Sequence, residues 1–415
     1  MLSILASSKN FSAAVARLSA LLGFFLLVLG SSAQAQYQLR GSVLDKETKE
    51  PIPFVSIGIP GTSLGTASNA DGQFFLNLPS LPQRVVFSEI GHLRDTLVVT
   101  STQKPFEVLL GSATITLPEV KVGSYAFQLV DRAYRHMADN YDEKFYGKAY
   151  YRQVTRIGAE PTELQEMIWN VKSNNARIEG TTTTQGRFAA KQALLNFTNF
   201  SFNTKGYGLY NPNADSTVSL ALLSPNAVKN YYVELQGILE KGDANIAEIT
   251  FETRPEVEGY QANGTVWIDT DTYKVVRFTI TSPNYTSASQ NPTYKLKNTL
   301  LTFDLSFQNT PDPVSPLDYM KVKLTADVLR PGTPITKLDV SSFTFFYDTN
   351  RKPTGIAYER GTLDEKDRET IRQAKYDPEF WANNPVVQRT PVEDEVIKSF
   401  EQKGAFGTTI KPKRK

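Results

Sequence analysis

The sequence predicts a mainly β protein: a small N-terminal sandwich of seven strands, a linking helix, and a large curved antiparallel β domain with short C-terminal helices. Three observations support this. Apolar residues alternate with period two through most of the chain, as in strands that bury one face. Clusters of Gly, Pro, Asp and Asn separate these runs at hairpin spacing. One stretch near residue 130 shows instead the spacing of an amphipathic helix.

Composition places the chain among globular proteins with more than one core. Of its 415 residues, 40% are hydrophobic and 21% charged, which argues against disorder. The net charge of +2 favours neither nucleic acid nor an acidic surface, so we expect no nucleic-acid partner. Cysteine is absent, which excludes disulfides, thiolate metal ligands, a cysteine nucleophile and a lipid anchor attached to cysteine.

Residues 1–35 have the features of a secretory signal peptide. Lys9 and Arg17 supply positive charge, residues 18–29 are apolar, and Ala33 and Ala35 form a cleavage motif. The apolar run is short for a membrane anchor. We therefore expect export through the inner membrane and a periplasmic or outer-membrane-associated location.

Residues 36–122 are expected to form the sandwich. Turn residues such as Asn69, Asp71 and Gly72 separate its short alternating runs. The expected strands begin near Leu39, Val55, Phe74, Val85, Arg94, Phe106 and Thr114. Residues 123–145 then form the link, with a helix from an N-cap at Ser124 to about Asn140.

Residues 146–357 are expected to form the large β domain, because consecutive hairpins of this length favour one wide, curved sheet. Its expected strands are 147–156, 162–170, 175–179, 232–239, 246–252, 264–269, 274–281, 298–308, 320–329 and 338–348. The polar residues 181–186 read as a loop. Residues 196–213 mix aromatics with Asn and Gly, and predict either a loop pinned by aromatic anchors or an exposed aromatic surface for a ligand.

Residues 358–415 are expected to form a helical and basic tail. A charged helix is predicted over 364–373 and a second short helix from about Val392. Phe380, Trp381 and Phe400 would pack this tail back onto the β domain. The basic ending, 411–415, is predicted to be solvated.

Short motifs in the sandwich region resemble those of a known family. They are residues 41–45 (GSVLD), 51–55 (PIPFV), 61–62 (GT), 65–66 (GT), 69–74 (NADGQF) and 90–92 (IGH). Together they resemble the carboxypeptidase regulatory-like, or transthyretin-like, domain abundant in envelope proteins of Bacteroidota. The chain departs from the family pattern at Ser68, Asn69 and His92, where Thr, Asp and Tyr are usual. The resemblance implies a transthyretin-like β-sandwich.

A second resemblance lies in the large domain. Residues 264–269 (GTVWID) and 273–277 (YKVVR) are similar to a hairpin of LolA-like half-barrels, which carry lipoproteins through the periplasm. The resemblance implies a concave apolar face able to hold a lipid or another hydrophobic ligand. The candidate ligand-facing positions are Val266, Ile268, Val275, Phe278, Phe303 and Leu324.

The sequence nominates no catalytic, cofactor-binding or metal-binding residue. Residues 61–65 match G-x-S-x-G, but strand residues follow them where a hydrolase has a helix. The two histidines, His92 and His136, fall in different predicted domains and lack the spacing of a zinc site. Asp269 and Asp271 read as hairpin residues and lack the spacing of a calcium loop.

The leading hypothesis is a non-enzymatic envelope protein with a binding or assembly role, whose partner is another envelope protein. The alternative is a periplasmic carrier of a lipid or other hydrophobic ligand in the half-barrel. A hydrolase is a third class, for which no residue is nominated. Membrane-spanning strands are a further arrangement known in this compartment, but several predicted strands are short for it.

Overall fold

The computed structural model describes most of the chain that follows the predicted leader. The described residues are 37–62, 64–116, 122–191, 195, 197, 199–213, 221–242, 244–259, 261–285, 293–308, 310–374, 376–383, 386, 394, 397–398, 400, 406 and 409–410. The predicted signal peptide, the Ser63 of the G-x-S-x-G motif and the basic ending lie outside them. Within the described part, none of the helices combines the length and apolarity needed to cross a membrane.

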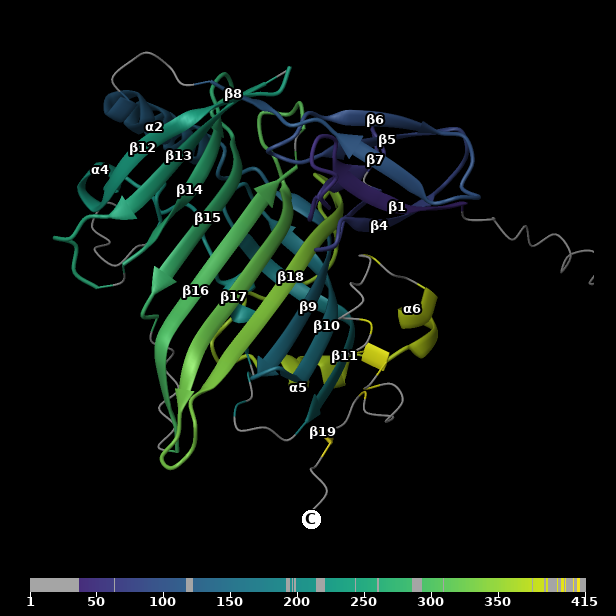
Figure 1. The fold of residues 1–415 in the computed structure, drawn as a ribbon, viewed down its shortest axis with the longest axis vertical. Coiled ribbons are helices and arrows are strands. Elements are labelled where there is room, and N and C mark those ends of the chain that lie inside the picture. Colours follow the sequence, from purple (N-terminus) through teal and green to yellow (C-terminus); the bar gives the residue numbers. More distant parts are fainter. Residues whose placement is uncertain are drawn as a thin grey trace, which may run out of the picture.

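The fold class is confirmed: the protein is mainly β, with a small sandwich beside a large sheet (Figure 1). The sandwich strands are β1 (Tyr37–Asp45), β2 (Ser56–Gly58), β3 (Gly65–Ala67), β4 (Gln73–Leu78), β5 (Gln83–Ser88), β6 (Asp95–Val99) and β7 (Phe106–Leu110). They form a three-stranded sheet in the order β4-β1-β7 and a four-stranded sheet in the order β3-β2-β5-β6. Alternating apolar side chains of the strands, among them Leu39, Ile57 and Phe87, meet in one core.

The seventh sandwich strand is not where the sequence predicts it. The run from Thr114 was expected to complete the sandwich, but β8 (Thr114–Thr116) pairs with the strand β12 (Tyr231–Glu240) of the large sheet. All three residues of β8 are exposed, so the strand offers the sandwich no apolar face. The missing strand is β3, formed by residues 65–67, which the sequence reading treats as part of a turn region.

Gly41 shows why the sandwich motif contains a glycine. It lies on β1, between β4 and β7, where it faces Phe74 and Phe106. A Cβ atom here would lie only 2.1 Å from the carbonyl oxygen of Phe106 and 3.0 Å from the ring of Phe74. Only a residue without a side chain lets the two neighbouring strands approach this closely.

We therefore expect Gly41→Ala to lower the free energy of unfolding by about 1–3 kcal/mol, because the added methyl overpacks the core against backbone. Urea unfolding followed by circular dichroism would measure the change. Gly58→Ala is the matched control, since its Cβ would meet nothing closer than 3.8 Å. That control should stay within about 0.5 kcal/mol of the parent. An equal effect of the two substitutions would contradict this account of Gly41.

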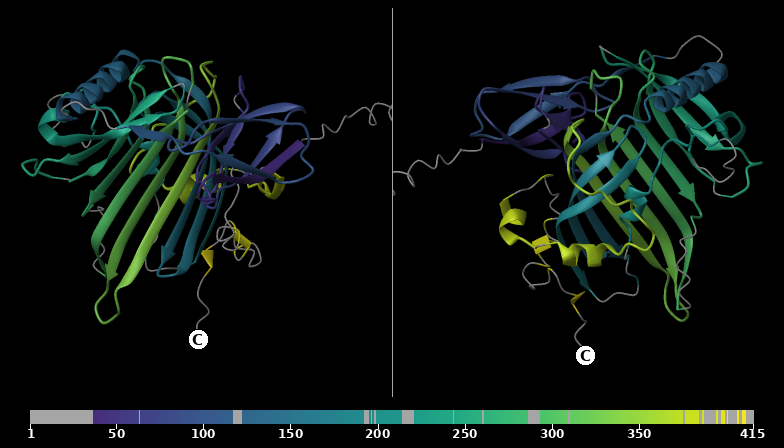
Figure 2. Two further views of the ribbon diagram at one scale, coloured as in Figure 1. Left: turned by 45° about the horizontal axis from the view of Figure 1, so that its top comes forward. Right: turned by 180° about the vertical axis from the view of Figure 1, so that it is seen from behind.

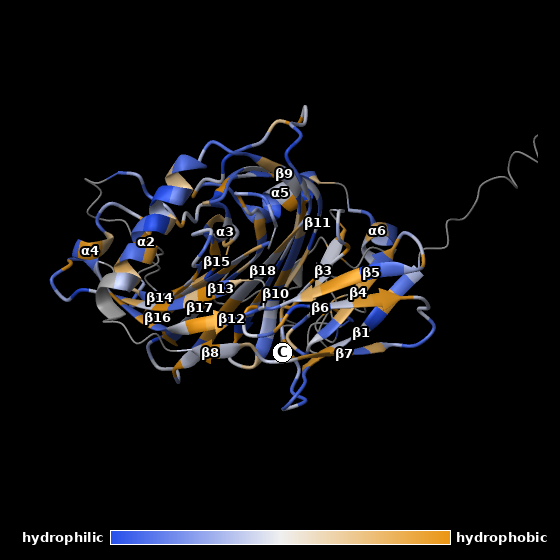
Figure 3. Ribbon diagram, turned by 90° about the horizontal axis from the view of Figure 1, so that it is seen from above, coloured by the Kyte–Doolittle hydropathy of each residue, from blue (hydrophilic) through white to orange (hydrophobic). Residues whose placement is uncertain are grey.

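The large sheet has twelve strands in the order β19-β11-β10-β9-β18-β17-β16-β15-β14-β13-β12-β8. The strands not yet described are β9 (Phe145–Ile157), β10 (Glu160–Ser173), β11 (Ile178–Lys191), β12 (Tyr231–Glu240), β13 (Asn245–Thr253), β14 (Asn263–Asp269), β15 (Val275–Pro283), β16 (Lys295–Phe307), β17 (Leu317–Leu329), β18 (Thr336–Asn350) and β19 (Thr409–Ile410). All pairings are antiparallel except that of β11 with β19. The sheet is strongly curved (Figure 2), and hydrophobic residues alternate with hydrophilic ones along its strands (Figure 3).

One predicted loop is part of a strand. Residues 181–186, expected to be a loop for their polarity, belong to β11 and pair with β10. On the other side of β11, Thr181 exchanges backbone hydrogen bonds with Glu359, at 2.9 and 3.0 Å. Hydrogen bonds from neighbouring segments on both sides therefore satisfy the backbone N–H and C=O groups of this strand. This pairing stabilises a strand where the local sequence favours one only weakly.

The concave side of the sheet is filled by the chain itself. The helix α2 (Val122–Asp139) confirms the predicted linking helix and buries Ala126, Leu129, Val130, Ala133 and Met137 in the main core. It packs against β12 and β14 across the concave side (Figure 2). Two further helices on this side, α3 (Phe202–Lys205) and α4 (Ala227–Asn230), are short.

The aromatic stretch after β11 is a loop with aromatic anchors, the first of the two alternatives. Phe200 and Leu209 are buried in the main core. Tyr207 stacks on Phe303 of β16, with ring centroids 4.6 Å apart. Tyr210 stacks on Tyr134 of α2, with centroids 5.4 Å apart. These contacts bring the loop into the concave side of the sheet.

The C-terminal segment packs back onto the sheet, as predicted. The helix α5 (Asp367–Gln373) lies within the predicted range and packs against β11. The described residues 394, 397, 398 and 400 are helical, in agreement with the second predicted helix, while α6 (Pro378–Asn383) was not predicted. The Asp367 carboxylate accepts a hydrogen bond from the Ser201 hydroxyl at 2.5 Å, which joins α5 to the filling loop. Trp381 and Phe400 are buried in two small clusters on the convex face.

Candidate functional site

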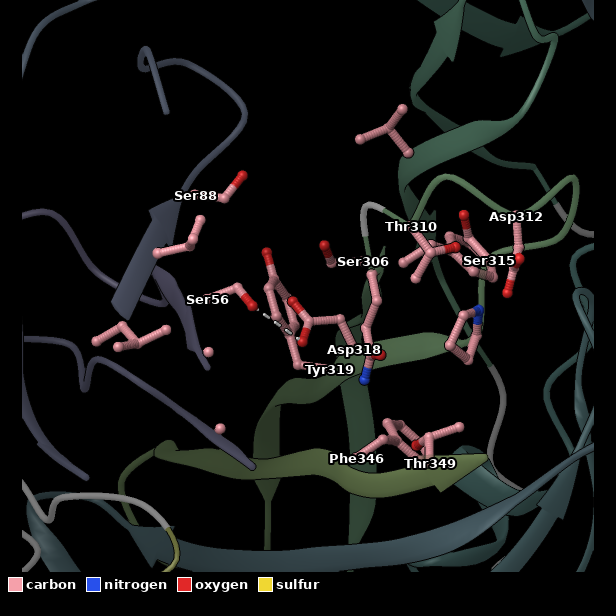
Figure 4. A pocket seen from close by; sticks show the side chains of 18 of the residues that line it. Ser56, Ser88, Ser306, Thr310, Asp312, Ser315, Asp318, Tyr319, Phe346 and Thr349 are labelled. Carbon is pink, nitrogen blue, oxygen red and sulfur yellow. Dashed lines mark hydrogen bonds between the residues drawn. The ribbon is translucent and has the colours of Figure 1, made fainter. Parts of the chain in front are cut away.

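A cleft of about 610 Å³ lies between the sandwich and one end of the large sheet (Figure 4). Its sandwich wall comes from the β2–β3 hairpin and the end of β5. Its other wall comes from the β12–β13, β14–β15 and β16–β17 connections and the end of β18. A volume of this size is typical of small-molecule and side-chain binding sites, which often lie between domains.

The sandwich wall presents hydroxyl groups because of strand alternation. Val55 and Ile57 point into the sandwich core, so Ser56 on β2 points out of it. Ser56 is paired with Ser88 on the neighbouring strand β5, and both line the cleft. Figure 4 shows both serines on the sandwich side of the space.

The opposite wall contains a buried carboxyl group, Asp318, at a β-bulge. On β16, Ser306 pairs with Tyr319 and the next residue, Phe307, pairs with Leu317, which leaves Asp318 as an extra residue on β17. A bulge of this kind redirects a side chain that would otherwise follow the strand's alternation, and bulges often lie beside functional sites. Here it directs Asp318 toward Ser56 of the other domain (Figure 4).

Asp318 lies in a low-dielectric environment. Its side chain is 4% exposed, and the Ser56 hydroxyl lies 3.4 Å from it, a long hydrogen bond between the two domains. Burial raises the pKa of Asp318 to about 7, and the bond from Ser56 offsets this only in part. At neutral pH the group is therefore divided between a neutral acid that donates a hydrogen bond and a carboxylate.

A chain of alternating charges joins the two domains beside the cleft. Arg277 on β15 donates two hydrogen bonds to Asp304 on β16, at 2.9 and 3.0 Å. Lys321 on β17 lies 2.7 Å from the same carboxylate. Arg277 also lies 3.7 Å from Glu89 of the sandwich. Burial alone would raise the pKa of Asp304, but Lys321 and Arg277 hold it below its usual value.

The chain ends in the sandwich at His92, one of the three departures from the family pattern. The His92 Nδ1 atom lies 2.6 Å from Glu89 and its Nε2 atom 3.1 Å from Asp45. A carboxylate only accepts hydrogen bonds, so the protonated ring, in which both nitrogens are donors, satisfies both contacts at once. The hydrogen bond to Glu89 is the main cause that raises the pKa of His92.

The two histidines are expected to affect stability in opposite directions as pH changes. The raised pKa of His92 stabilises the fold below its unfolded pKa of about 6.5, and that contribution is lost as pH rises through the folded value. Burial lowers the pKa of His136, so the fold loses stability there as pH falls below about 6.5. Urea unfolding between about pH 5 and 8 should show that His92→Gln removes the first dependence and His136→Gln the second. A His92→Gln variant that keeps the parent's pH dependence would contradict this assignment.

The basic side chains around the cleft are engaged by the chain's own oxygens. Lys274 donates to the carbonyl oxygens of Thr310 and Asp312, at 2.8 and 3.1 Å. Lys241 donates to the carbonyl oxygen of Glu89 at 2.5 Å. Arg351 donates to Glu143 outside the cleft. These contacts position the loops of the large sheet against the sandwich.

The six predicted ligand-facing residues all lie on the concave side, in or against the main core. Val266, Ile268, Val275, Phe278 and Leu324 are buried there by other parts of the chain. Phe303 is partly buried under Tyr207. The six are thus brought together on the concave side, and of them Val275 alone also lines the cleft. A ligand-binding role for them stays a prediction.

Sequence reasoning missed Asp318, although a signal for it exists. The inward apolar positions on β17 are even-numbered from Met320 to Val328, but the preceding inward residue is Leu317. This break in the alternation is the signature of a bulge at residues 318–319. His92 was noticed only as a departure from the family, because its partners Asp45 and Glu89 come together through folding.

The G-x-S-x-G motif does not form a nucleophile elbow. Gly61 has a φ of +75° in the connection between β2 and β3, and Gly65 begins β3. The motif therefore joins two strands of one hairpin, whereas the elbow joins a strand to a helix. Within the described residues, no group of three or more His, Asp or Glu side chains is placed to hold a metal ion.

Comparison with known proteins gives a family match for the N-terminal part of the chain. A family model described as the CarboxypepD_reg-like domain matches residues 39–122. No curated protein matches the chain. Among solved structures, the chain is similar to a DUF1329 family protein from Desulfovibrio piger ATCC 29098, with 11% identity over 56% of this chain and 95% of that one. The TM-score of that match is 0.24.

Proposed function

We propose that this chain is an exported, non-enzymatic binding protein of a bacterial cell envelope, and that the cleft between its two domains holds its partner. The observation that carries the proposal is the cleft itself, whose 610 Å³ is lined by both domains. It includes a buried carboxyl group that a bulge directs into the space. Neither domain alone supplies both walls, so the arrangement of the two domains defines the site.

An envelope location rests on the sequence. The leader-like residues 1–35, the absence of cysteine and the regulatory-like domain fit a protein exported by a Gram-negative bacterium, in agreement with the resemblance to Bacteroidota proteins. We infer from these features a periplasmic or outer-membrane-associated protein whose partner is another envelope component.

Binding is favoured over catalysis by the state of the polar groups at the cleft. His92, which does not itself line the cleft, has a carboxylate within hydrogen-bond distance of each ring nitrogen, so neither nitrogen is directed at a ligand. The hydroxyl group of Ser56 faces a neutral or weakly basic carboxyl group, Asp318, rather than a histidine. These groups are suited to hold a ligand by hydrogen bonds and charge.

The alternative, carriage of a hydrophobic ligand on the concave face, would require the chain to vacate that face. Tyr207 would have to leave Phe303, and α2 would have to leave β12. The six apolar positions nominated from sequence already pack against other side chains. We therefore place the binding site in the cleft.

The lack of cysteine makes a direct test straightforward. A single cysteine at Ser88 in the cleft, or at the exposed control Ser101, would carry a short photo-crosslinker on the full mature chain. Periplasmic and outer-membrane fractions of the source organism would supply partners. A discrete cross-linked species from Ser88→Cys that is absent from Ser101→Cys supports the proposal. Equal patterns from both positions, or none from Ser88→Cys, would contradict it.

A further inference from the structure

We propose that the cleft accepts an organic cation, a primary ammonium or guanidinium group such as that of a lysine or arginine side chain, with the Asp318 carboxylate as its counter-ion. The inference rests on the proposed function, since it names the chemistry of the ligand at that same cleft. Four features support it: the isolation of Asp318, the engagement of the neighbouring charges, the aromatic wall and the titration of the carboxyl group.

Asp318 forms no ion pair with any residue that the structure describes. The contact it makes is the long one from Ser56. Asp304, an acidic residue on the adjacent strand, shows the contrast, because it has two cationic partners at 2.7–3.0 Å. A buried carboxylate without a cation is costly, and a cation from outside the chain would remove that cost.

The basic residues nearest to the cleft are already occupied. Arg277 is held by Asp304 and Glu89, and Lys274 is held by two carbonyl oxygens. A ligand carboxylate or phosphate would have to compete with these contacts. Asp269, another acid of the cleft, accepts two backbone N–H groups of its own hairpin, at 2.7 and 3.0 Å. Asp312 is 60% exposed to solvent and lies 3.9 Å from Arg351, so Asp318 is the buried acid of the cleft that is left to meet a ligand.

Aromatic rings line the same space. Phe54 comes from the sandwich, and Tyr319, Phe345 and Tyr347 come from the large sheet. The face of an aromatic ring attracts cations. The Lys321 ammonium already lies 3.8 Å from the centroid of the Phe54 ring, which shows that this wall accommodates a cation. An alkyl stem with a charged end therefore fits both the rings and the carboxyl group.

Titration of Asp318 should make the affinity for a cation depend on pH. Because its pKa is about 7, a bound cation must shift the group toward the carboxylate and release a proton. Binding should therefore tighten by about tenfold between pH 6 and pH 8, since the ionised fraction of a group of pKa 7 rises about tenfold. An alkylammonium stays charged throughout this range.

The test uses three probes with the same phenylethyl body: phenethylammonium, 2-phenylethanol and 3-phenylpropionate. Calorimetry on the full mature chain measures their affinities at pH 6 and pH 8, and amide shifts of Ser56 and Ser88 in NMR spectra locate them. We expect phenethylammonium to bind at least about tenfold more tightly than the alcohol at pH 8, and Asp318→Asn to abolish this preference. Asp312→Asn, which alters an exposed acid of the same cleft, should preserve it.

The outcomes separate this inference from the proposed function. If the alcohol or the propionate binds in the cleft as tightly as the ammonium, or if Asp318→Asn keeps the preference, the inference fails and the cleft remains a binding site. If none of the probes binds at millimolar concentration, both fail. If phenethylammonium binds as expected, two further probes are compared: blocked lysine (Nα-acetyl-lysine methylamide) and cadaverine. Tighter binding of the blocked lysine indicates a peptide side chain as the ligand, and tighter binding of cadaverine indicates a free amine. Asn replaces Asp318 with little change in shape, and thermal unfolding checks that each variant is folded.

Discussion

Replacing Phe278 with alanine is expected to lower the free energy of unfolding by about 4 kcal/mol, because a fully buried aromatic side chain leaves both lost contacts and a cavity. Phe278 has no exposed surface. Its ring stacks on that of Phe251, with centroids 5.4 Å apart and the planes 9° from parallel. Tyr207 of the filling loop lies against it with a centroid distance of 6.4 Å. Urea unfolding would measure the loss.

This substitution decides whether the concave face is core or ligand site. The control is Ile335→Ala, at a side chain that is 63% exposed, which should change stability by no more than about 0.5 kcal/mol. A Phe278→Ala variant as stable as the parent would contradict the packed interior. So would a parent protein that is strongly stabilised by added lipid, because a ligand stabilises the fold that binds it.

Replacing Asp304 with alanine is expected to cost about 3 kcal/mol, since it leaves two largely buried cations without their shared partner. Arg277 and Lys321 both contact this carboxylate, whose side chain is 13% exposed. Arg277 also reaches Glu89 of the sandwich, so we expect the loss to loosen the joint between the domains as well. Chemical unfolding measures the stability, and hydrogen exchange of β2 and β5 reports on the joint.

Asp339→Ala is the matched control for this experiment. Asp339 pairs with Lys323 at 3.0 Å, but these side chains are 32% and 53% exposed, so the pair should contribute less than about 1 kcal/mol. If Asp304→Ala lowered the free energy of unfolding as little as Asp339→Ala does, the contacts of Asp304 would contribute no more than an exposed surface ion pair. The account of the domain joint would then be wrong.

The fold could be predicted from the sequence where local signals are strong. Period-two alternation located the strands of the large sheet from β12 to β18, and helical spacing located α2. The wrong strand predictions have a common cause. Residues 181–186 become a strand because β10 and the chain around Glu359 pair with them, and β8 leaves the sandwich because β12 offers it a partner. Such pairings depend on residues far away in the sequence.

The candidate site was less predictable than the fold, since it exists only between domains. Ser56 and Asp318 are 262 positions apart in the sequence, and the residues around either one do not predict its contact with the other. The chain from His92 through Glu89 to Arg277 also crosses the domain boundary. A break in alternation at Asp318 and a histidine where the family usually has tyrosine were the local traces of this arrangement.

If the cleft binds its ligand through Asp318, the titration of this one carboxyl group must change when the ligand is bound. NMR of protein labelled with ¹³C at aspartate carboxyl carbons would follow Asp318, assigned with Asp318→Asn, across pH with and without phenethylammonium. We expect the Asp318 carboxyl group to have a pKa of about 7 in the unliganded protein and a clearly lower pKa when the cation is present. An Asp318 pKa that is unchanged by saturating cation would contradict this expectation.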